Sequence, residues 1–573
     1  MSHKKAQNTQ EEYLKTLGQY APVIALCLLI LTWVMQLWRA DFRVPFAYFV
    51  DSLFYSIAAK GTIENGWWLH NPSLGAPAGL HYEAYPAIDN FHFVIVKLIS
   101  LFTSDHALVL NLFYLLTFPL TAITAFYFLR SFKLSFGPSL VASLLYTFLP
   151  YHFFRRYHLM MGAYYLIPLM VLVVVWVCLE PRLTRRKAVA SVVICVISGS
   201  CGVYYPFFFC FLLLVAGVSS WWNRRSVAPL VAALVLTGVV AGTLLINHLP
   251  TIIYQRTHGA ASMGSRSVAD SEIMGLKITQ LLLPIGGHRW EKFAALKYRY
   301  NLGPLVNEND TSSLGIIGSI GFLILIGALF SRRQLPALIE RLSWLNIAAV
   351  LLGTIGGFGV LFALLISPQI RAYNRISPFI AFFSLIVVAW LLDILFKKLP
   401  RPRLQLLYYV GLAVVLVVGV LDQTTTTFFF VPEYEKTKME YEDEAEFVSR
   451  IEASLPPHSM VFQLPYMPFP ESPGLYQMRA YEHYKAYLHS KTLRWSYGAP
   501  LGEEEDRWQQ AVAAQPVPEL VKSVRAAGFS GIYINRDGYE DHAAKLDSEL
   551  TSLLRTQPIV NREGNLAFYK LAQ

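Results

Sequence analysis

The sequence predicts an all-α polytopic membrane protein with a smaller α/β region at its C-terminal end. The 573 residues have a mean hydropathy of +0.41 and are 54% hydrophobic but only 15% charged, against roughly 25% charged in soluble domains. Apolar runs near the ~20 residues that a bilayer requires recur along most of the chain. They do not alternate as the strands of a membrane barrel do, and the chain turns polar only in its last quarter.

Eleven apolar runs are predicted to span the membrane. The first, "APVIALCLLILTWVMQLW", is followed by no small-residue cleavage site, so we expect it to remain as an anchor. The predicted spans are 21–38, 107–129, 136–150, 164–179, 188–203, 204–222, 227–249, 313–330, 344–366, 378–396 and 404–422.

The basic residues predict which loops face the cytoplasm, where positive charge gathers. If segment 86–103 does not cross the membrane, most basic residues fall in connections on one side, which is then the cytoplasmic side. If segment 86–103 were a span, the "EPRLTRRK" and "NRRS" loops would lie outside. The net charge of +10 therefore reflects orientation and gives no indication of nucleic-acid binding. The basic residues on that side are Lys4, Lys5, Lys15, Arg130, Lys133, Arg182, Arg185, Arg186, Lys187, Arg224, Arg225, Arg332, Arg333, Arg341, Lys397, Lys398, Arg401 and Arg403.

This orientation divides the chain into a membrane domain, 1–423, and an extracytoplasmic domain, 424–573. The first outer loop, 39–106, contains two predicted juxtamembrane helices, 46–60 and the amphipathic segment 86–103. A second long outer loop covers 250–312, and its "SEIMGLKITQLLLPIGG" is predicted to form an interfacial helix or a lid. The tail alternates strand-like runs such as "FSGIYINR" with helical ones such as "VPELVKSVRAAG", which is typical of an α/β fold.

Asp51, in "FVDSLFYSIAAKG", is the candidate catalytic residue. A carboxylate in such apolar company is costly unless it is used, and Tyr55 lies one turn away on the same helical face. A carboxylate beside apolar surface has a raised pKa and accepts a proton readily, which favours a general base. The alternative is an ordinary ion pair with Arg43 or Lys60.

Further acids and aromatic residues surround this position. Asp89 begins the second juxtamembrane helix, either as an ordinary N-cap or as a second carboxylate for an acceptor or a metal. Asp41, at the end of the first span, is a rival acid or a marker of the interface. Trp67, Trp68 and Tyr85 suit stacking on a sugar or anchoring at the membrane surface.

Two clusters of cations occupy outer loops, where positive charge is disfavoured. Such clusters favour an anion, and arginine binds phosphate through two parallel hydrogen bonds; snorkelling to ordinary phospholipids is the alternative. The candidate phosphate-binding residues are His152, Arg155, Arg156 and His158 in "YHFFRRYHLMMGAY", and Arg371 and Arg375 in "RAYNRIS".

Several chemistries lack their motifs in this sequence. It contains no glycine-rich phosphate loop, no HExxH and no paired CxxC, so nucleotide hydrolysis and zinc-protease chemistry are set aside. The acids do not have metal-ligand spacing; we assign no metal, although a divalent ion is compatible with the chemistry. Because the charged groups gather outside, where nucleotides are scarce, a lipid-borne sugar donor is expected.

The layout resembles the GT-C superfamily of polytopic glycosyltransferases, which use polyprenyl-phosphate sugars. The stretches that carry the resemblance are "DSLFYSIAAKGTIENGWWLHNPSLGAPAGL", "YPAIDNFHF", "LPYHFFRRYHLMMGAYYLIPL", "RAYNRISPFIAFFSL", and in the tail "VFQLPYMPFPE", "LRWSYGAP" and "GFSGIYINRDGY". Within the superfamily the chain is similar to bacterial YfhO-like sugar transferases. The resemblance implies a catalytic Asp in the first outer loop, which is Asp51 here. The family acid often follows a glycine, whereas Val50 stands here, and no "WWD" triplet of oligosaccharyltransferases occurs.

The function expected from these features is transfer of a sugar at the outer face of a bacterial cytoplasmic membrane. Asp51 would take the proton of a hydroxyl on a glycan, lipid or protein acceptor, with inversion at the sugar, while Arg155, Arg156 and Arg371 hold the departing lipid phosphate. A translocase for lipid-linked sugars is the main alternative, but it would require polar residues deep within spans, and these are few. A polysaccharide polymerase or ligase shares nearly all of these features.

Overall fold

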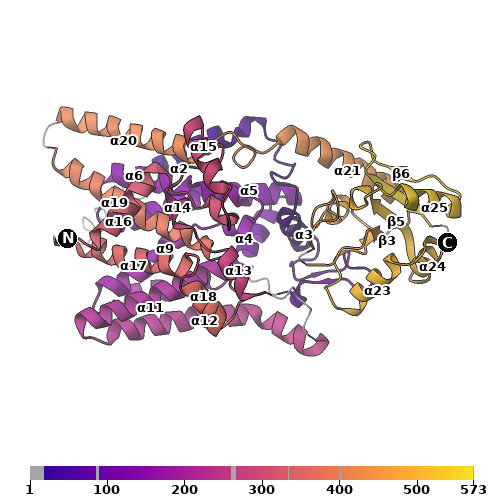
Figure 1. Ribbon diagram of the computed structural model, residues 1–573, viewed down its shortest axis with the longest axis horizontal. Helices are drawn as coiled ribbons and strands as arrows, with labels where there is room; N and C mark the ends of the chain where they lie inside the picture. Colours follow the sequence, from indigo (N-terminus) through magenta and orange to yellow (C-terminus); the bar gives the residue numbers. More distant parts are fainter. Residues whose placement is uncertain are drawn as a thin grey trace, which may run out of the picture.

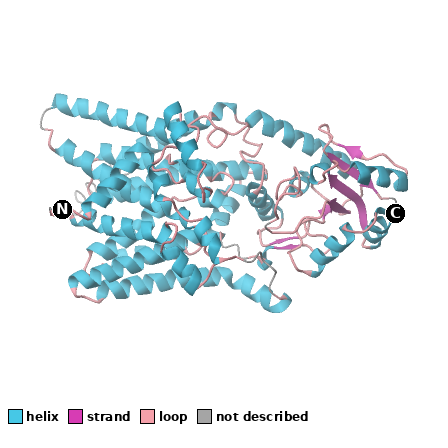
Figure 2. Cartoon of the chain, in the orientation of Figure 1, coloured by secondary structure: helices cyan, strands magenta, loops and turns pink. Residues whose placement is uncertain are grey.

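The computed structural model describes residues 18–85, 89–259, 266–332, 334–399, 402–470 and 472–571. A bundle of helices forms one end of the molecule, and the C-terminal region forms the other (Figure 1). The strands gather at the C-terminal end (Figure 2). Of the residues used to orient the chain, Lys4, Lys5, Lys15, Arg333 and Arg401 lie outside the described residues.

Each predicted span coincides with helical structure in the bundle. Five described helices are long and apolar enough to cross a membrane, namely His106–Ser131, Tyr204–Arg224, Ala228–His258, Tyr373–Lys397 and Arg403–Gln423. The count of eleven spans stays a prediction. The bundle helices are α2 (Tyr20–Met35), α5 (His106–Ser131), α6 (Phe136–Thr147), α9 (Ile167–Leu179), α10 (Arg185–Ser198), α11 (Tyr204–Arg224), α12 (Ala228–His258), α16 (Gly315–Ala328), α17 (Ala337–Gly353), α18 (Phe358–Leu365), α19 (Ser377–Lys397) and α20 (Pro402–Gln423).

The connections between these helices contain shorter elements. They are η1 (Leu37–Arg39), α7 (Pro150–Phe154), α8 (Leu159–Gly162), α13 (Val268–Ile273), α14 (Ile278–Leu282), α15 (Glu291–Asn301), η3 (Glu308–Thr311) and η4 (Tyr373–Ile376).

Two predicted helices are interrupted, and the interruptions pair with each other. The predicted span 344–366 is divided into α17 and α18, and the predicted helix 271–287 into α13 and α14. The Leu276 amide donates to the Gly353 carbonyl (2.7 Å), and the Ile355 amide donates to the Leu276 carbonyl (3.2 Å). Both breaks thus exchange local helical hydrogen bonds for long-range ones, which keeps the backbone groups satisfied.

The first outer loop contains α3 (Asp51–Glu64), the short ribbon β1 (His70–Asn71) and β2 (Leu80–His81), η2 (Tyr82–Ala84) and α4 (Asn90–Ser100). With 11 residues α4 is about 16 Å long, too short to cross a bilayer. Its Val94 and Leu98 are exposed, whereas His92 is buried. An apolar exposed face on a short helix agrees with the predicted amphipathic segment.

The C-terminal region is built on a five-stranded mixed sheet in the order β4-β3-β5-β7-β6. β3 pairs in parallel with β4 and β5, whereas β7 pairs antiparallel with β5 and β6. Helices cover the sheet, so that alternate residues of β5 face two separate apolar clusters. The strands are β3 (Met460–Leu464), β4 (Arg494–Trp495), β5 (Phe529–Asn535), β6 (Ile559–Val560) and β7 (Leu566–Lys570); the helices are α21 (Tyr434–Ser454), α22 (Tyr484–His489), α23 (Glu504–Ala513), α24 (Val517–Ala526), α25 (Ala544–Leu554) and η5 (Arg536–Gly538).

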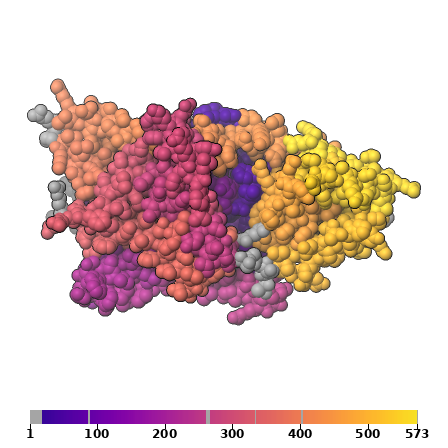
Figure 3. Space-filling model, in the orientation of Figure 1, coloured from indigo at the N-terminus to yellow at the C-terminus, as the bar shows by residue number. Residues whose placement is uncertain are grey.

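The first outer loop is attached to this C-terminal region. The Lys60 ammonium of α3 donates to carbonyl oxygens at the end of α22, those of Tyr487 (2.6 Å), Leu488 (3.3 Å) and Ser490 (2.5 Å). Backbone hydrogen bonds also join residues 73–76 to β4 and the residues that follow it. The surface between the bundle and the C-terminal region is hollowed, and residues of the first outer loop are visible in the hollow (Figure 3).

Candidate active site

A cavity of about 780 Å³ opens where the first outer loop, the loops of the bundle and the C-terminal region meet. We call it the main cavity. Its wall is formed by α3, the start of α4, segment 158–161, the start of α11, the end of α12, loop 369–375 and segment 472–481. Its acidic, basic and histidine residues are Asp51, Asp89, His158, His248, Arg266, Arg371 and Arg375.

Asp51 is the first residue of α3 and is paired with His158. The His158 Nε2 lies 2.5 Å from Asp51 Oδ2; because an ionised carboxylate can only accept, Nε2–H is the donor. Burial lowers the pKa of His158, although the hydrogen bond to Asp51 opposes this shift, so the imidazole is neutral at neutral pH. Among the described residues Oδ1 has no hydrogen-bond partner, and the side chain is 36% exposed, which leaves Oδ1 for a ligand.

This pairing differs from both expectations for these residues. His158 contacts the carboxylate rather than standing free to bind phosphate. Lys60, one of the alternative partners of Asp51, is bonded to α22, and among the described residues the ion pair of Asp51 is with His158 and not with the Arg43 side chain. Asp51 is therefore not held by either base.

Asp89 and Tyr55 stand beside Asp51 in the main cavity. Asp89 occupies the N-cap position of α4 but makes no capping hydrogen bond. Its Oδ1 is buried 3.5 Å from the imidazole of His92 and has no hydrogen-bond partner in the described part of the chain. Burial and the nearby carboxylates of Asp89 and Asp51 raise the pKa of the Tyr55 phenol well above its usual value. Tyr55 is thus a neutral hydrogen-bond donor close to both acids.

Arg371 and Arg375 supply positive charge to the same cavity. Among the described residues the Arg371 side chain has no hydrogen-bond or ion-pair partner. Arg375 directs Nε (3.2 Å) and Nη2 (3.0 Å) at the Glu308 carboxylate and lies over the ring of Tyr204, at 4.5 Å from its centroid. This fork on Glu308 leaves the Arg375 Nη1 unused.

Arg155 lies behind this wall and does not line the main cavity. It is fully buried, with Nη2 3.1 Å from Glu308 Oε2. Burial alone would raise the pKa of Glu308, but the guanidiniums of Arg155 and Arg375 hold it well below its usual range. Glu308 therefore stays ionised and joins both arginines.

Arg156 and His152 also have partners inside the protein. The Arg156 guanidinium donates to the carbonyls of Phe428 (2.8 Å) and Phe429 (3.1 Å). The buried His152 ring contacts the Thr117 hydroxyl (2.8 Å) and the Thr147 carbonyl (2.9 Å). Neither residue lines the main cavity, so their predicted phosphate contacts have no support in its geometry.

The predicted aromatic residues and Asp41 also differ in whether they line the main cavity. Tyr85 lines the main cavity. Trp68 is buried and stacks on Phe93, with ring centroids 4.9 Å apart, and Trp67 packs partly buried against the core. Asp41 lies outside the cavity, in an ion pair with Lys438 (2.9 Å). Of the three aromatic residues, only Tyr85 is placed to meet a ligand there.

Glu308 is the functional residue that sequence reasoning missed. It lies within the predicted loop 250–312, where "NEND" offered only a short acidic cluster as a signal. Its importance comes from the arginines of two other loops, which no local pattern reveals. Among the described residues, no group of three or more His, Cys, Asp or Glu side chains is placed to hold a metal ion.

Comparisons with known proteins give a fold. No family model matches the chain, and no curated protein sequence matches it. ArnT from Cupriavidus metallidurans in the apo state is 12% identical, with a TM-score of 0.52 over 97% of this chain and 98% of that one. The chain has the GT-C fold.

Other solved structures also match this chain. ArnT bound to undecaprenyl phosphate is 13% identical, with a TM-score of 0.50 over 96% of this chain and 98% of ArnT. The archaeal oligosaccharyltransferase AglB from Archaeoglobus fulgidus is 11% identical, with a TM-score of 0.44 over 90% of this chain and 69% of AglB. The two ArnT structures confirm the fold that the resemblance implied, and the fold alone.

Proposed function

We propose that the chain is a membrane glycosyltransferase that moves a sugar from a polyprenyl-phosphate donor to an acceptor hydroxyl at the outer face of a bacterial cytoplasmic membrane. The observation that carries the proposal is the main cavity, in which Asp51, oriented by His158, faces the same space as Arg371 and Arg375. The likeness to ArnT, which has been crystallised with undecaprenyl phosphate, supports a lipid-phosphate donor.

The chemistry proposed for this cavity is a single displacement. Asp51 Oδ1 accepts the proton of the acceptor hydroxyl while the hydroxyl oxygen attacks the anomeric carbon. The bond from that carbon to the phosphate oxygen breaks, and its electron pair leaves with the lipid phosphate. Attack from the face opposite the phosphate inverts the configuration.

The cations act on the leaving group. Negative charge grows on the phosphate as the bond breaks, and preorganised cations aimed at that charge stabilise the transition state. Among the described residues that line the main cavity, Arg371 and the Nη1 of Arg375 have no hydrogen-bond partner, so they are the proposed phosphate ligands. Glu308 fixes the orientation of the Arg375 guanidinium before the substrate binds, so the entropy of ordering this side chain is not lost during the reaction.

The test is turnover by purified protein in lipid nanodiscs with a radiolabelled polyprenyl-phosphate sugar. Asp51→Asn keeps the size of the side chain and removes the base, so we expect kcat to fall by about 10²- to 10⁴-fold while binding of the donor lipid is retained. Asp41→Asn is the matched control, because Asp41 lies outside the main cavity in an exposed ion pair. Full turnover by folded Asp51→Asn would contradict the proposed base. Donor binding without any transfer by the wild-type protein would instead favour a translocase.

A further inference from the structure

A second cavity, of about 350 Å³, lies between the first outer loop and the C-terminal sheet. We call it the acidic cavity, because six carboxylates line it: Glu433, Glu440, Glu444, Glu482, Asp537 and Glu563. Three of its four cations already have partners in the protein, and one of these, Lys436, lies 3.6 Å from the Glu433 carboxylate. Lys485 pairs with Glu440 and Glu444, and Arg156 donates to backbone carbonyls.

The position of the acidic cavity in the sheet is one that ligands use. β3 and β5 are parallel, and Asn535 and Asp537 lie at the carboxyl end of β5. Asn565 precedes β7, which runs antiparallel to β5 and so starts at the same edge. In open α/β sheets, ligands bind in the crevice outside the carboxyl ends of the parallel strands.

Tyr533 presents an unused polar group to this cavity. Its side chain is 2% exposed and lines the acidic cavity from β5. Among the described residues its hydroxyl has no hydrogen-bond partner. Burial raises the pKa of the phenol, and the nearby carboxylates of Glu444, Glu482 and Asp537 raise it further. The polar groups of buried side chains normally have a hydrogen-bond partner. An unpaired hydroxyl aimed into a cavity indicates a ligand.

The lining determines the chemical class of that ligand. Carboxylate and amide oxygens accept hydrogen bonds from hydroxyl groups, and the amides of Asn535 and Asn565 add to the carboxylates here. Tyr48 and Phe49 contribute aromatic surface, with Arg479 over the Phe49 ring at 6.0 Å. A saccharide offers many hydroxyl donors together with apolar C–H faces, whereas the excess of carboxylates would repel an anion.

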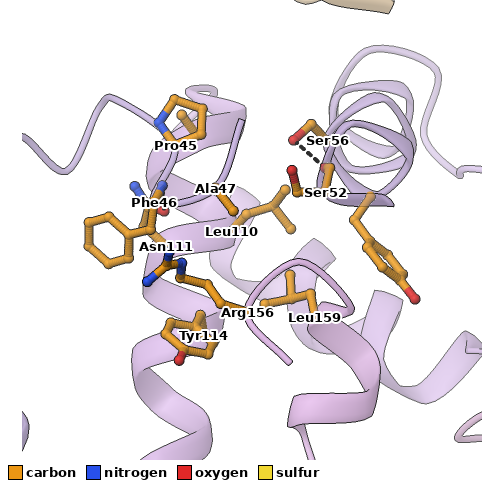
Figure 4. A pocket seen from close by; sticks show the side chains of 12 residues that line it. Pro45, Phe46, Ala47, Ser52, Ser56, Leu110, Asn111, Tyr114, Arg156 and Leu159 are labelled. Atoms are coloured by element: carbon orange, nitrogen blue, oxygen red, sulfur yellow. Dashed lines mark hydrogen bonds between the residues drawn. The ribbon is translucent and has the colours of Figure 1, made fainter. Parts of the chain in front are cut away.

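A third, small cavity of about 30 Å³ has lining residues in common with both the acidic cavity and the main cavity. Figure 4 shows the side chains that line this small cavity. It shares Tyr55 with the main cavity and Phe46 and Arg156 with the acidic cavity. A ligand in the acidic cavity therefore lies next to the beginning of α3, which carries Asp51.

We propose that the acidic cavity binds a saccharide, with the Tyr533 hydroxyl and the Glu482 carboxylate among its hydrogen-bond partners. This assignment rests on the proposed function: the saccharide is the glycan part of the acceptor, and it is bound away from the sugar that is transferred. The C-terminal region then selects the acceptor, while the bundle holds the lipid-linked donor.

The test is binding of the labelled full-length protein in nanodiscs to a printed array of mono- to tetrasaccharides, followed by titration of the saccharide that binds best. Tyr533→Phe removes only the hydroxyl and keeps the ring, and Glu482→Gln removes only the charge. We expect each to weaken this binding about 5- to 20-fold, as the loss of one hydrogen bond does. Tyr497→Phe is the matched control, since Tyr497 is a buried tyrosine of the same region whose hydroxyl also has no partner but lies outside the acidic cavity.

Two results would overturn the proposal: no saccharide on the array binds to the wild-type protein, or both cavity variants bind as tightly as Tyr497→Phe. Binding of labelled undecaprenyl phosphate in the same nanodiscs reports on the main cavity separately. Saccharide binding that persists in a protein without any transfer activity would contradict the proposed function and leave the saccharide site supported.

Discussion

The Asp51 carboxylate owes its orientation to one hydrogen bond. His158 fixes Oδ2 at 2.5 Å, while its own Nδ1 is buried and has no hydrogen-bond partner among the residues that the structure describes. Protonation of His158 would add a proton at Nδ1, which would then be a buried donor without an acceptor. It would also convert the hydrogen bond into an ion pair, which stabilises the ionised form of Asp51 and makes it a weaker base. In the proposed reaction His158 is therefore a positioning residue, and the neutral imidazole is the form that serves it.

His158→Gln tests this role through the pH dependence of turnover. Glutamine can still donate a hydrogen bond to Asp51 but does not titrate. Because the His158 pKa is lowered from 6.5, the wild-type protein should lose activity as the pH falls below 6.5, when the imidazole becomes charged. We expect the variant to turn over about tenfold more slowly at pH 7.5 and to lose the part of the acid limb that His158 contributes. The measurement is kcat between pH 5 and 8.

The control for this prediction is His70→Gln, a histidine outside the main cavity. An unchanged acid limb in His158→Gln, with donor binding intact, would show that the imidazole does not act through Asp51.

Single residues were predictable where a local pattern was enough. Asp51 and Tyr55 were placed on one face by helical spacing, and both line the main cavity. The two adjacent arginines, Arg155 and Arg156, were predicted to bind phosphate, and instead they contact Glu308 and backbone carbonyls. Their partners lie over a hundred residues away in the chain, so no spacing rule could reveal that these arginines already have partners within the protein.

At the scale of elements, Glu308 joins three loops. Its carboxylate in η3 contacts Arg155 after α7 and Arg375 in η4. The contact holds the Arg375 side of the main cavity against the bundle. Removing one partner of a buried ion pair leaves uncompensated charge, which costs about 3–5 kcal/mol.

Glu308→Gln should therefore lower the stability of the protein by about that amount, measured as a fall in Tm in nanodiscs. The Glu308 pKa is depressed below its ordinary 4.5, so its stabilisation is complete above pH 4.5 and is lost as the pH falls further. The difference in Tm between wild type and variant should shrink below pH 4.5. The control is Glu291→Gln, which changes an exposed acid at the start of α15 and should leave Tm unchanged. Equal Tm values for Glu308→Gln and wild type would contradict the stabilising role of the contacts between Glu308 and the two arginines.

A second link between elements attaches α3 to the C-terminal region. Lys60 caps three carbonyls at the end of α22, where a cation is favourable because helix C-termini carry partial negative charge. Lys60→Met should unpair these buried carbonyls and destabilise the attachment by about 1–3 kcal/mol. We expect faster hydrogen exchange of amides 484–490 and slower turnover with little change in donor binding. Unchanged exchange would show that the attachment does not depend on Lys60.

Elements were predictable to the extent that hydropathy defines them. Each predicted span coincides with helical structure, and the short amphipathic α4 was expected from its charge pattern. The breaks within 344–366 and 271–287 were not, because each depends on hydrogen bonds to the other. The apolar sequence "LLGTIGGFGV" contains no periodic pattern that would indicate a break in the helix. The break depends on hydrogen bonds to the distant residue Leu276.

At the scale of the whole molecule, the main cavity is built from both ends of the chain. Segment 472–481 of the C-terminal region and α3 of the first outer loop line it together with loops of the bundle. Which side of the membrane this shared wall faces decides which donors and acceptors can reach Asp51. The proposed reaction requires the outer side, because its donor is proposed to be a lipid-linked sugar used at that face. The positive-inside rule predicts that orientation, since it places the set of basic connections on the opposite, cytoplasmic side.

Single cysteines test this orientation in intact bacterial cells. Glu540 is exposed in the C-terminal region, and Pro181 is exposed in the loop between α9 and α10 that is predicted to be cytoplasmic. We expect Glu540→Cys to react with a membrane-impermeant maleimide in intact cells, and Pro181→Cys to react only after permeabilisation. The wild-type chain gives the background, because four of its five cysteines are buried and the fifth is only partly exposed. The reverse pattern would place the main cavity in the cytosol, where the carboxylate and cations would meet soluble nucleotide sugars, and the proposal of a lipid-linked donor used at the outer face would then fail.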